Sequence, residues 1–471
     1  MPRKSNDIDL VPKDQRPITR RKRQPPNSEP MPQFEPLKIP NKIGYSKLSP
    51  SITNAYNIFT VFFTTEIFQT LADSTNKNAK LILSRQDHST LKKPRPWVDT
   101  TVDEMRAFVA FWIYMGIYKM PRIDQYWGKG DRRKSSRIRP TSEYVQNQMS
   151  LIRWQQINRF FHISAPVDGK EKVFDKVCPL DDHLRLTSRK LWETGRDLSI
   201  DEAIQGFSGR ASETVNLPCK PTPKGFKIWV LAENGYILDW MYHSRGSKAN
   251  DGPYQLDKYW QRPKNGAFSP TQSLVLQLLE KKDPSTGVRF LDALKHVIYL
   301  DNLFTSPQLF MTLRQMGIGA CGTVKTGKTP REEILEREAV KEKHQSISTT
   351  DITRSPRRPR TIPAKEPFDG FLMSLRTQYE DVIKLGDKWG RLSSDKGVLE
   401  ISWRDNRTVL IMTTVHDGKS QVTMHIVLEC YCQLKNLKRN FRGYSKPKTA
   451  SACKRQPPSP RPSTCFWHGV S

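Results

Sequence analysis

The chain has 471 residues, enough for two or three domains with their own hydrophobic cores. Its 77 Lys and Arg residues exceed its 48 Asp and Glu residues, and the formal net charge of +29 predicts a polyanionic partner such as nucleic acid. The seven Cys residues show no pairing pattern, and the longest apolar run, Ala107 to Tyr118, is too short to span a bilayer. These features argue against a disulfide-stabilised secreted protein and against a membrane protein, so we expect a basic intracellular protein.

Residues 1–50 are polar, basic and rich in Pro, and we expect them to be disordered. Within them, Arg20-Arg21-Lys22-Arg23 fits a nuclear-import signal or a contact to the DNA backbone. An ordinary solvated run of charge explains the same cluster equally well.

Residues 51–195 are expected to form a mainly helical region. The apolar segment Tyr56–Phe68 predicts a helix, and the capping box that begins at Thr101 predicts a second helix over Met105–Tyr118. A third helical segment runs from Trp154 to Ile163.

Arg residues and aromatic residues alternate in this third segment, and such a pattern can bind DNA. More often the aromatic side chains belong to the core, and we assign Trp154, Phe160 and Phe161 to it. For Arg153, both a DNA contact and a solvated surface position remain open.

The periodicity changes near residue 197, and the next segments predict strands and helices in the order β-β-β-α-β-α-β. The predicted strands are Leu198–Glu202, Phe226–Leu231, Tyr236–Tyr242, His296–Leu300 and Ile318–Val324, and the predicted helices cover 271–282 and 307–316. We therefore expect an α/β fold with a mixed sheet over residues 196–325.

Residues 326–396 are charged and poor in apolar side chains, and we expect an inserted linker. Two late strands, Gly397–Trp403 and Val409–Val415, are expected to complete the sheet within residues 397–417. The tail, residues 418–471, holds ten Lys and Arg residues and a single acid, Glu429.

Two predicted strands end in an acid, Asp201 in one and Asp301 in the other. If these strands are neighbours, both carboxylates lie at the carboxyl edge of the sheet, where sites form in α/β folds. Two close carboxylates repel each other, and a divalent cation such as Mg²⁺ or Mn²⁺ relieves the repulsion. The alternative is that each Asp caps a turn or a helix.

Several short motifs follow one another in order along the chain. The blocks around the two acids are Ser199-Ile200-Asp201-Glu202 and Tyr299-Leu300-Asp301-Asn302-Leu303-Phe304, and the later blocks are Gly322-Thr323-Val324-Lys325 and Trp403-Arg404-Asp405-Asn406. Together these blocks resemble those of piggyBac-type transposases over about residues 90–417. The resemblance implies an RNase H-like core, preceded by a helical region that serves DNA binding or dimerisation.

The resemblance also implies the chemistry. Asp201 and Asp301 would be metal ligands for Mg²⁺ or Mn²⁺, and two metal ions would support the cutting and joining of DNA at transposon ends. Lys220, Lys224, Lys227 and Arg245 are candidate phosphate contacts, although each also fits a solvated surface charge. Hairpin intermediates, TTAA targets, a homodimer and a nuclear location are further expectations.

The end of the chain departs from the family pattern, because the Gly-Gly-Val-Asp stretch that carries the third acid is not found. Asp417, directly after a predicted strand, is the candidate surrogate, with Glu429 as a second choice; a turn before Gly418 is the plainer role for Asp417. The Cys and His residues near the C-terminus lack the paired short spacings of a zinc cross-brace, so zinc is not expected. A frameshift or an error in the gene model would also explain this tail.

These departures leave two functions in competition. The chain is either a transposase with an impaired active site or a non-catalytic DNA-binding protein on the same scaffold. A third class, an unrelated basic nuclear interaction protein, conflicts with the ordered acid blocks.

Overall fold

The computed structural model describes residues 31–85, 96–127, 147–166, 173–218, 220–245, 251–253, 268–324 and 382–419, with single positions at 372, 375, 376 and 379. The basic cluster Arg20–Arg23, most of the predicted linker, and Glu429 with the rest of the tail from residue 420 lie outside the described residues. Among the described residues, no helix is both long and apolar enough to cross a bilayer.

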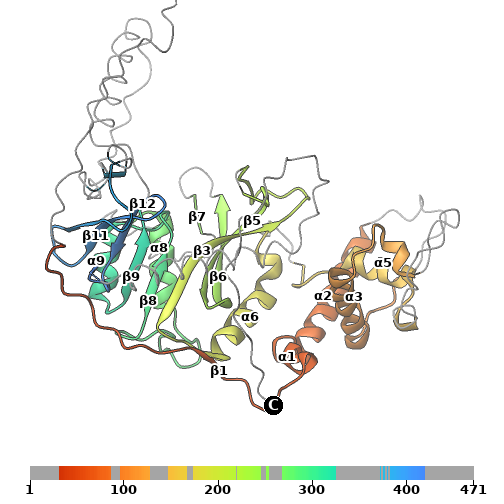
Figure 1. Ribbon diagram of the computed structural model, residues 1–471. Coiled ribbons are helices and arrows are strands. Elements are labelled where there is room, and N and C mark those ends of the chain that lie inside the picture. Colours follow the sequence, from red (N-terminus) through yellow and green to blue (C-terminus); the bar gives the residue numbers. More distant parts are fainter. Residues whose placement is uncertain are drawn as a thin grey trace, which may run out of the picture.

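Helices make up the first part of the described chain and lie together beside the sheet (Figure 1). They are α1 (Ala55–Phe62), α2 (Thr65–Ser84), α3 (Val102–Ile117), the short 3-10 helix η3 (Ile123–Trp127) and α5 (Leu151–Phe160). The helix predicted over Tyr56–Phe68 is in fact two helices. The break occurs because Thr64 leaves the helical conformation and its hydroxyl accepts a hydrogen bond from the Ile67 N–H, which starts α2.

The core of this helical region is aromatic. Trp154 and Phe108 are almost completely buried in one cluster, and the half-buried Phe161 packs against it. Phe160 is also buried, so Trp154 and Phe160 are core residues as predicted, and Phe161 lies at the margin of the core. Arg153 has an internal role, since its guanidinium lies 2.6 Å from the Glu104 carboxylate and 5.0 Å from the centre of the Trp97 ring. The alternation of Arg and aromatic residues therefore reflects packing in this helix.

A mixed sheet forms the second part, and the predicted order of strands and helices is confirmed. The elements are β3 (Asp197–Gly206), β5 (Lys224–Glu233), β6 (Tyr236–Arg245), α8 (Pro270–Glu280), β8 (Val297–Leu300), α9 (Pro307–Gln315) and β9 (Gly319–Thr323). Strands β3, β5 and β6 are antiparallel, whereas β8 pairs parallel to both β3 and β9. The turn between β5 and β6 has positive φ at Asn234 and Gly235, and Asn and Gly are the residues that adopt this conformation most readily.

Most of the remaining strands extend the sheet, and the first two strands of the chain pair with each other in a separate small sheet. The remaining elements are η4 (Asp175–Val177), α6 (Cys178–Lys190), β1 (Tyr45–Ser46), β2 (Trp192–Glu193), β4 (Thr214–Asn216), β7 (Asp251–Pro253), β10 (Lys388–Leu392), β11 (Leu399–Arg404) and β12 (Thr408–Thr413). The sheet order is β10-β11-β12-β9-β8-β3-β5-β6-β7, and β4 pairs with β5. Strand β10 lies inside the segment predicted to be a linker, so that prediction extended too far toward the C-terminus.

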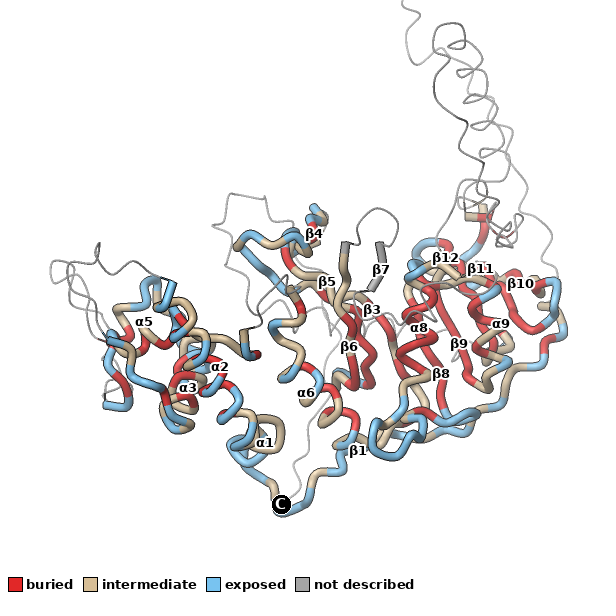
Figure 2. The backbone as a smooth tube through the Cα atoms, turned by 180° about the vertical axis from the view of Figure 1, so that it is seen from behind, coloured by how far each residue is buried: buried red, intermediate tan, exposed pale blue. Residues whose placement is uncertain are grey.

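The two faces of the sheet carry separate apolar clusters, and buried residues concentrate in the central strands and in α8 (Figure 2). One face packs against α8, in which every residue from Gln272 to Leu279 is buried. The other face, with Tyr299 and Ile411, packs against Phe34 from the N-terminal segment. A sheet covered on both faces fits the continuous apolar run of β8.

Residues 31–50 were predicted to be disordered together with residues 1–30, and the structure corrects this prediction. Phe34 is buried, and the Leu37 N–H donates to the Thr414 carbonyl at 2.8 Å. Further along, the Gly44 N–H donates to the buried Glu233 carboxylate at 3.0 Å. A few apolar side chains and main-chain hydrogen bonds thus order a segment whose overall composition is polar.

An ion network between α6, β6 and the end of α8 was not predicted from the sequence. The Asp239 carboxylate, only 1% exposed, lies 2.8 Å from both Arg189 and Lys281, and Arg185 lies 3.8 Å away. Burial alone would raise the pKa of Asp239, but the three cations outweigh it and hold the pKa below its usual value. The partners are far apart in sequence, so no local pattern reveals them.

His416 provides a test of this fold that depends on pH. Burial lowers the pKa of His416 to about 4, and its ring lies 6.5 Å from the ring of Tyr299. An unfolded His takes up a proton near pH 6.5, whereas the folded His416 resists protonation until about pH 4. The free energy of unfolding is therefore fully maintained above pH 6.5 and decreases as the pH falls toward 4. We expect wild type to lose about 2 kcal/mol more unfolding free energy between pH 7 and pH 5 than His416→Phe does. Urea titrations at the two pH values measure this difference, and equal losses would contradict the buried position.

Candidate active site

Strand pairing brings Asp201 and Asp301 to the same edge of the sheet. Strands β3 and β8 are parallel neighbours, with Ile200 opposite Leu300, and each of these residues is followed by one of the two acids. Because residues at the same level of neighbouring parallel strands project to the same face, the two carboxylates share one face as well as one edge.

The two acids have different surroundings. Asp201 is buried, at 6% exposure, and its Oδ1 accepts the Glu202 N–H at 2.7 Å. Asp301 is half-buried, and its Oδ1 accepts the Asn302 N–H at 2.6 Å and the Thr323 hydroxyl at 3.3 Å. Thr323 belongs to β9, which pairs with β8 on the side away from β3. Its hydrogen bond to Asp301 was not predicted from the sequence.

The turn after Asp301 is braced from two helices. The Asp301 carbonyl accepts the Phe304 N–H at 3.0 Å, and the Ser306 hydroxyl caps α9 by accepting the Leu309 N–H. The Gln272 side chain, from the first turn of α8, donates to that same hydroxyl at 2.8 Å. Asp301 therefore does take part in a turn, which was the alternative to a metal-binding role. The turn bond uses the Asp301 backbone carbonyl, so carboxylate oxygen remains available for a ligand.

Glu202, the next residue along β3, alternates to the other face and is neutralised internally. Its carboxylate lies 2.5 Å from the ammonium groups of both Lys220 and Lys227. Burial opposes ionisation of Glu202, but hydrogen bonds from the two Lys residues outweigh it and lower the pKa. Lys227 also lies 4.1 Å from the centre of the Trp229 ring.

The four predicted phosphate contacts are thus not equivalent. Lys220 and Lys227 are held by Glu202, whereas Lys224 is exposed at the start of β5. Arg245 ends β6 with its backbone opposite Asp251, and its side chain is outside what the structure describes.

The structure does not bring Asp417 to the two acids. Strand β12 is antiparallel to β9, so its C-terminal end lies at the edge opposite Asp301. Ile411 is level with Thr323 and Thr414 bonds Ala320, so the chain has moved about 10 Å away from the level of Asp301 before Asp417 is reached. The Asp417 carboxylate instead accepts the Lys419 N–H at 3.0 Å, which is the role of a turn residue.

The donor set at the carboxyl edge fits a hard divalent cation. Asp201 and Asp301 offer carboxylate oxygens, which are the ligands that Mg²⁺ and Mn²⁺ prefer. Within the described ranges, no group of three or more His, Cys, Asp or Glu residues is arranged to hold a metal ion. The two acids therefore suit one ion whose other positions are filled by water or substrate oxygens.

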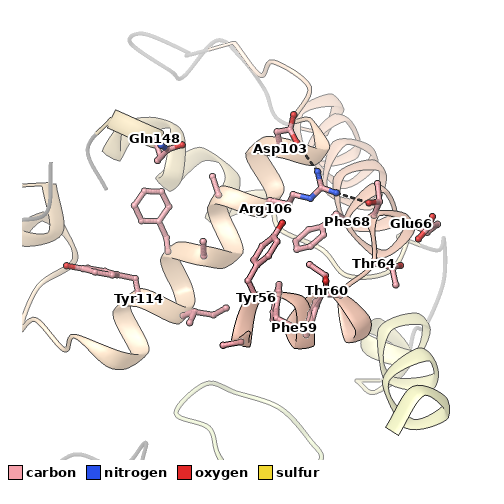
Figure 3. Close-up of a pocket in the computed structure, with 17 residues that line it drawn as sticks. Tyr56, Phe59, Thr60, Thr64, Glu66, Phe68, Asp103, Arg106, Tyr114 and Gln148 are labelled. Carbon is pink, nitrogen blue, oxygen red and sulfur yellow. Dashed lines mark hydrogen bonds and ion pairs between the residues drawn. The ribbon is translucent and has the colours of Figure 1, made fainter. Parts of the chain in front are cut away.

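A large pocket lies elsewhere, in the helical region (Figure 3). Its volume is about 1110 Å³, and α1, α2 and α3 line it mainly with apolar side chains such as Phe59, Phe68 and Tyr114. Arg106, the one cation among the described residues that line it, is bonded to Asp103 and Thr65. A lining of this kind suits an apolar ligand better than a phosphate.

The sequence is similar to a transposase family and to proteins derived from transposable elements. The family model described as Transposase IS4 matches residues 54–353. The human PiggyBac transposable element-derived protein 2 is 23% identical over 254 residues, which are 51% of this chain and 37% of that protein. The human PiggyBac transposable element-derived protein 5 is 23% identical over 305 residues, or 64% of this chain and 52% of that protein. The chain thus spans about a third to a half of the length of these relatives.

A solved structure has a similar fold. The cryo-EM structure of a piggyBac transposase synaptic complex with hairpin DNA matches with a TM-score of 0.54 and 19% sequence identity, covering 85% of this chain and 70% of that one. The family match extends over well over half of the chain and includes both strands that end in an acid. The chain belongs to the Transposase IS4 family, among the piggyBac-type transposases and the proteins derived from them.

Proposed function

We propose that this chain binds double-stranded DNA at the carboxyl edge of its sheet and processes it with a divalent metal ion, at low efficiency. The observation that carries the proposal is the parallel pairing of β3 with β8, which sets Asp201 and Asp301 side by side. Both would hold the ion. When bound, the ion supplies Lewis-acid activation of a water or a 3′-hydroxyl and stabilises the leaving oxygen.

The chain's own residues would fix the geometry of this site. Thr323 and the Asn302 N–H donate to one oxygen of Asp301 and so orient its carboxylate. The Glu202 N–H does the same for Asp201. Oriented carboxylates bind an ion with less loss of side-chain freedom than mobile ones.

Low efficiency follows from the number of ligands. Two carboxylates can hold one ion, but two-metal chemistry needs further ligands to keep two ions about 4 Å apart. Asp417 cannot serve as such a ligand, because it lies at the edge of the sheet opposite Asp201 and Asp301. The second candidate function, a DNA-binding protein without catalysis, is favoured by the same observation.

The partner and location in this proposal follow from charge and family. The net charge of +29 favours DNA, and the similar solved complex contains hairpin DNA. By analogy we propose transposon ends and TTAA-type targets as substrates and a homodimer as the assembled form. The Arg20–Arg23 cluster supports a nuclear location.

Metal binding should be visible without catalysis. At a Mn²⁺ concentration 100 times its dissociation constant, wild type should gain about 2.7 kcal/mol of unfolding free energy. Asp301→Asn should show no gain, because one of the two carboxylates is lost. Thermal unfolding with and without Mn²⁺ measures the effect.

Glu202→Gln is the matched control for this measurement, since it removes an acid from the same strand. It should lower stability by about 1–3 kcal/mol, because Lys220 and Lys227 lose their partner. It should nevertheless keep the Mn²⁺ gain. An unchanged Mn²⁺ gain in Asp301→Asn would contradict the proposed metal site.

Catalysis should be slow and should depend on the two acids. With Mg²⁺ and a labelled transposon-end duplex, we expect weak nicking that disappears in Asp201→Ala and Asp301→Ala. Asp417→Ala should nick like wild type, because this residue lies at the opposite edge of the sheet. Nicking that persists in Asp301→Ala would exclude the proposed role, and a strong effect of Asp417→Ala would contradict the strand direction.

DNA binding should weaken steeply with salt. Each neutralised phosphate releases counterions, and the logarithm of the binding constant falls by about 0.9 per contact for each tenfold rise in salt. Fluorescence anisotropy with transposon-end and random duplexes measures the slope and the preference. Equal affinity for both duplexes at physiological salt would indicate simple charge attraction and would contradict end recognition.

A further inference from the structure

The hairpin between β11 and β12 turns at the same edge of the sheet as the two acids. Strand β12 starts at this edge because it is antiparallel to β9. Ile411 is level with Thr323, and the Val324 N–H donates to the Leu410 carbonyl at 2.9 Å. Residues 405–407, which precede β12, therefore extend past the level of Asp301.

The ribbon on the other side of the acids also extends past them. Strands β3 and β5 remain paired as far as Gly206 and Gly225, five residues beyond Asp201. The ends of the two ribbons thus project beyond Asp201 and Asp301 on either side of them. A nucleic acid strand that reaches the acids passes beside both ribbons.

Arg407 is an exposed cation in the turn of the second ribbon at this edge. It is exposed, and it forms no ion pair with any acid in the described part of the chain. Its carbonyl accepts the Asp405 N–H at 3.2 Å, and this bond holds the turn. In contrast to Lys220 and Lys227, the charge of Arg407 is not neutralised by a neighbouring carboxylate.

The spacing suits a contact to the DNA backbone near the reacting group. Two strand spacings separate β8 from β12, which amounts to about 10 Å sideways, and the residues from Ile411 back to Arg407 add about 13 Å along the strand. Successive phosphates of one DNA strand rise about 3.4 Å along the helix axis. The guanidinium of Arg407 therefore reaches a phosphate a few nucleotides from the one held at the acids.

We propose that Arg407 is a positioning residue that binds a DNA phosphate a few nucleotides from the reacting one and so fixes the strand against Asp201 and Asp301. This inference rests on the proposed function, since it names a contact of the same DNA at the same edge. Arg suits this task because its planar guanidinium can donate two parallel hydrogen bonds to a phosphate.

The sheet contains a matched control at its opposite edge. Lys396 lies in the turn between β10 and β11, is exposed, and forms no ion pair with a described acid. Because β10 pairs antiparallel with β11, and β11 pairs antiparallel with β12, this turn is at the end of the ribbon that points away from the acids. Arg407→Gln and Lys396→Gln each remove one positive charge from the same ribbon.

The experiment uses the full-length chain and a labelled random-sequence duplex, with binding measured by anisotropy over a series of salt concentrations. Arg407→Gln should reduce the slope of log K against log salt by about 1, the value for one lost phosphate contact. Lys396→Gln should leave the slope unchanged, and Arg407→Lys should restore most of it. The unfolding temperatures of all variants should match wild type, because Arg407 is exposed and its side chain makes no ion pair with a described acid.

The outcomes separate this inference from the proposed function. If wild type binds with a steep salt slope and Arg407→Gln and Lys396→Gln behave alike, the role of Arg407 is overturned while DNA binding stands. If wild type fails to bind the duplex, the proposed DNA partner is overturned and the inference falls with it.

Discussion

The parallel pairing of β3 with β8 is the constraint on which the rest of the structure depends. It joins an antiparallel half, β3 to β7, to a half reached through the helices α8 and α9. All four residues of β8 are buried, and Leu198, Ile200 and Leu300 pack in one apolar cluster. Since a shift by one residue would turn this apolar set to the other face, the register that buries these side chains also aligns Asp201 with Asp301.

The alternation of side chains along β3 separates a structural acid from a candidate metal ligand. Asp201 and Glu202 are adjacent in sequence but face opposite sides of the sheet. Glu202 meets Lys220 and Lys227, which satisfy its charge within the fold. Asp201 lies beside Asp301, where two carboxylates on one face create a need for positive charge that an ion can meet.

The sequence was a good guide where the signal was local. The apolar run before Asp301, the Asn234-Gly235 pair between β5 and β6 and Pro307 at the start of α9 are local features of this kind, and the order of elements was predicted from local patterns. The failures involve partners distant in the chain. The edge at which Asp417 lies depends on the direction of β12. The ordered conformation of residues 31–50 depends on the packing of Phe34 and on a hydrogen bond from Leu37 to Thr414. Neither has a local periodicity that a sequence can reveal.

The central claim is that Asp201 and Asp301 together hold one divalent ion. The most direct measurement is anomalous diffraction from crystals of the full chain grown with Mn²⁺, with data collected at the manganese absorption edge. The account predicts a manganese peak within coordination distance of carboxylate oxygens from both residues, at about 2.0–2.3 Å as for other hard-cation sites. A structure in which manganese binds elsewhere, or binds only one of these two carboxylates, would contradict it.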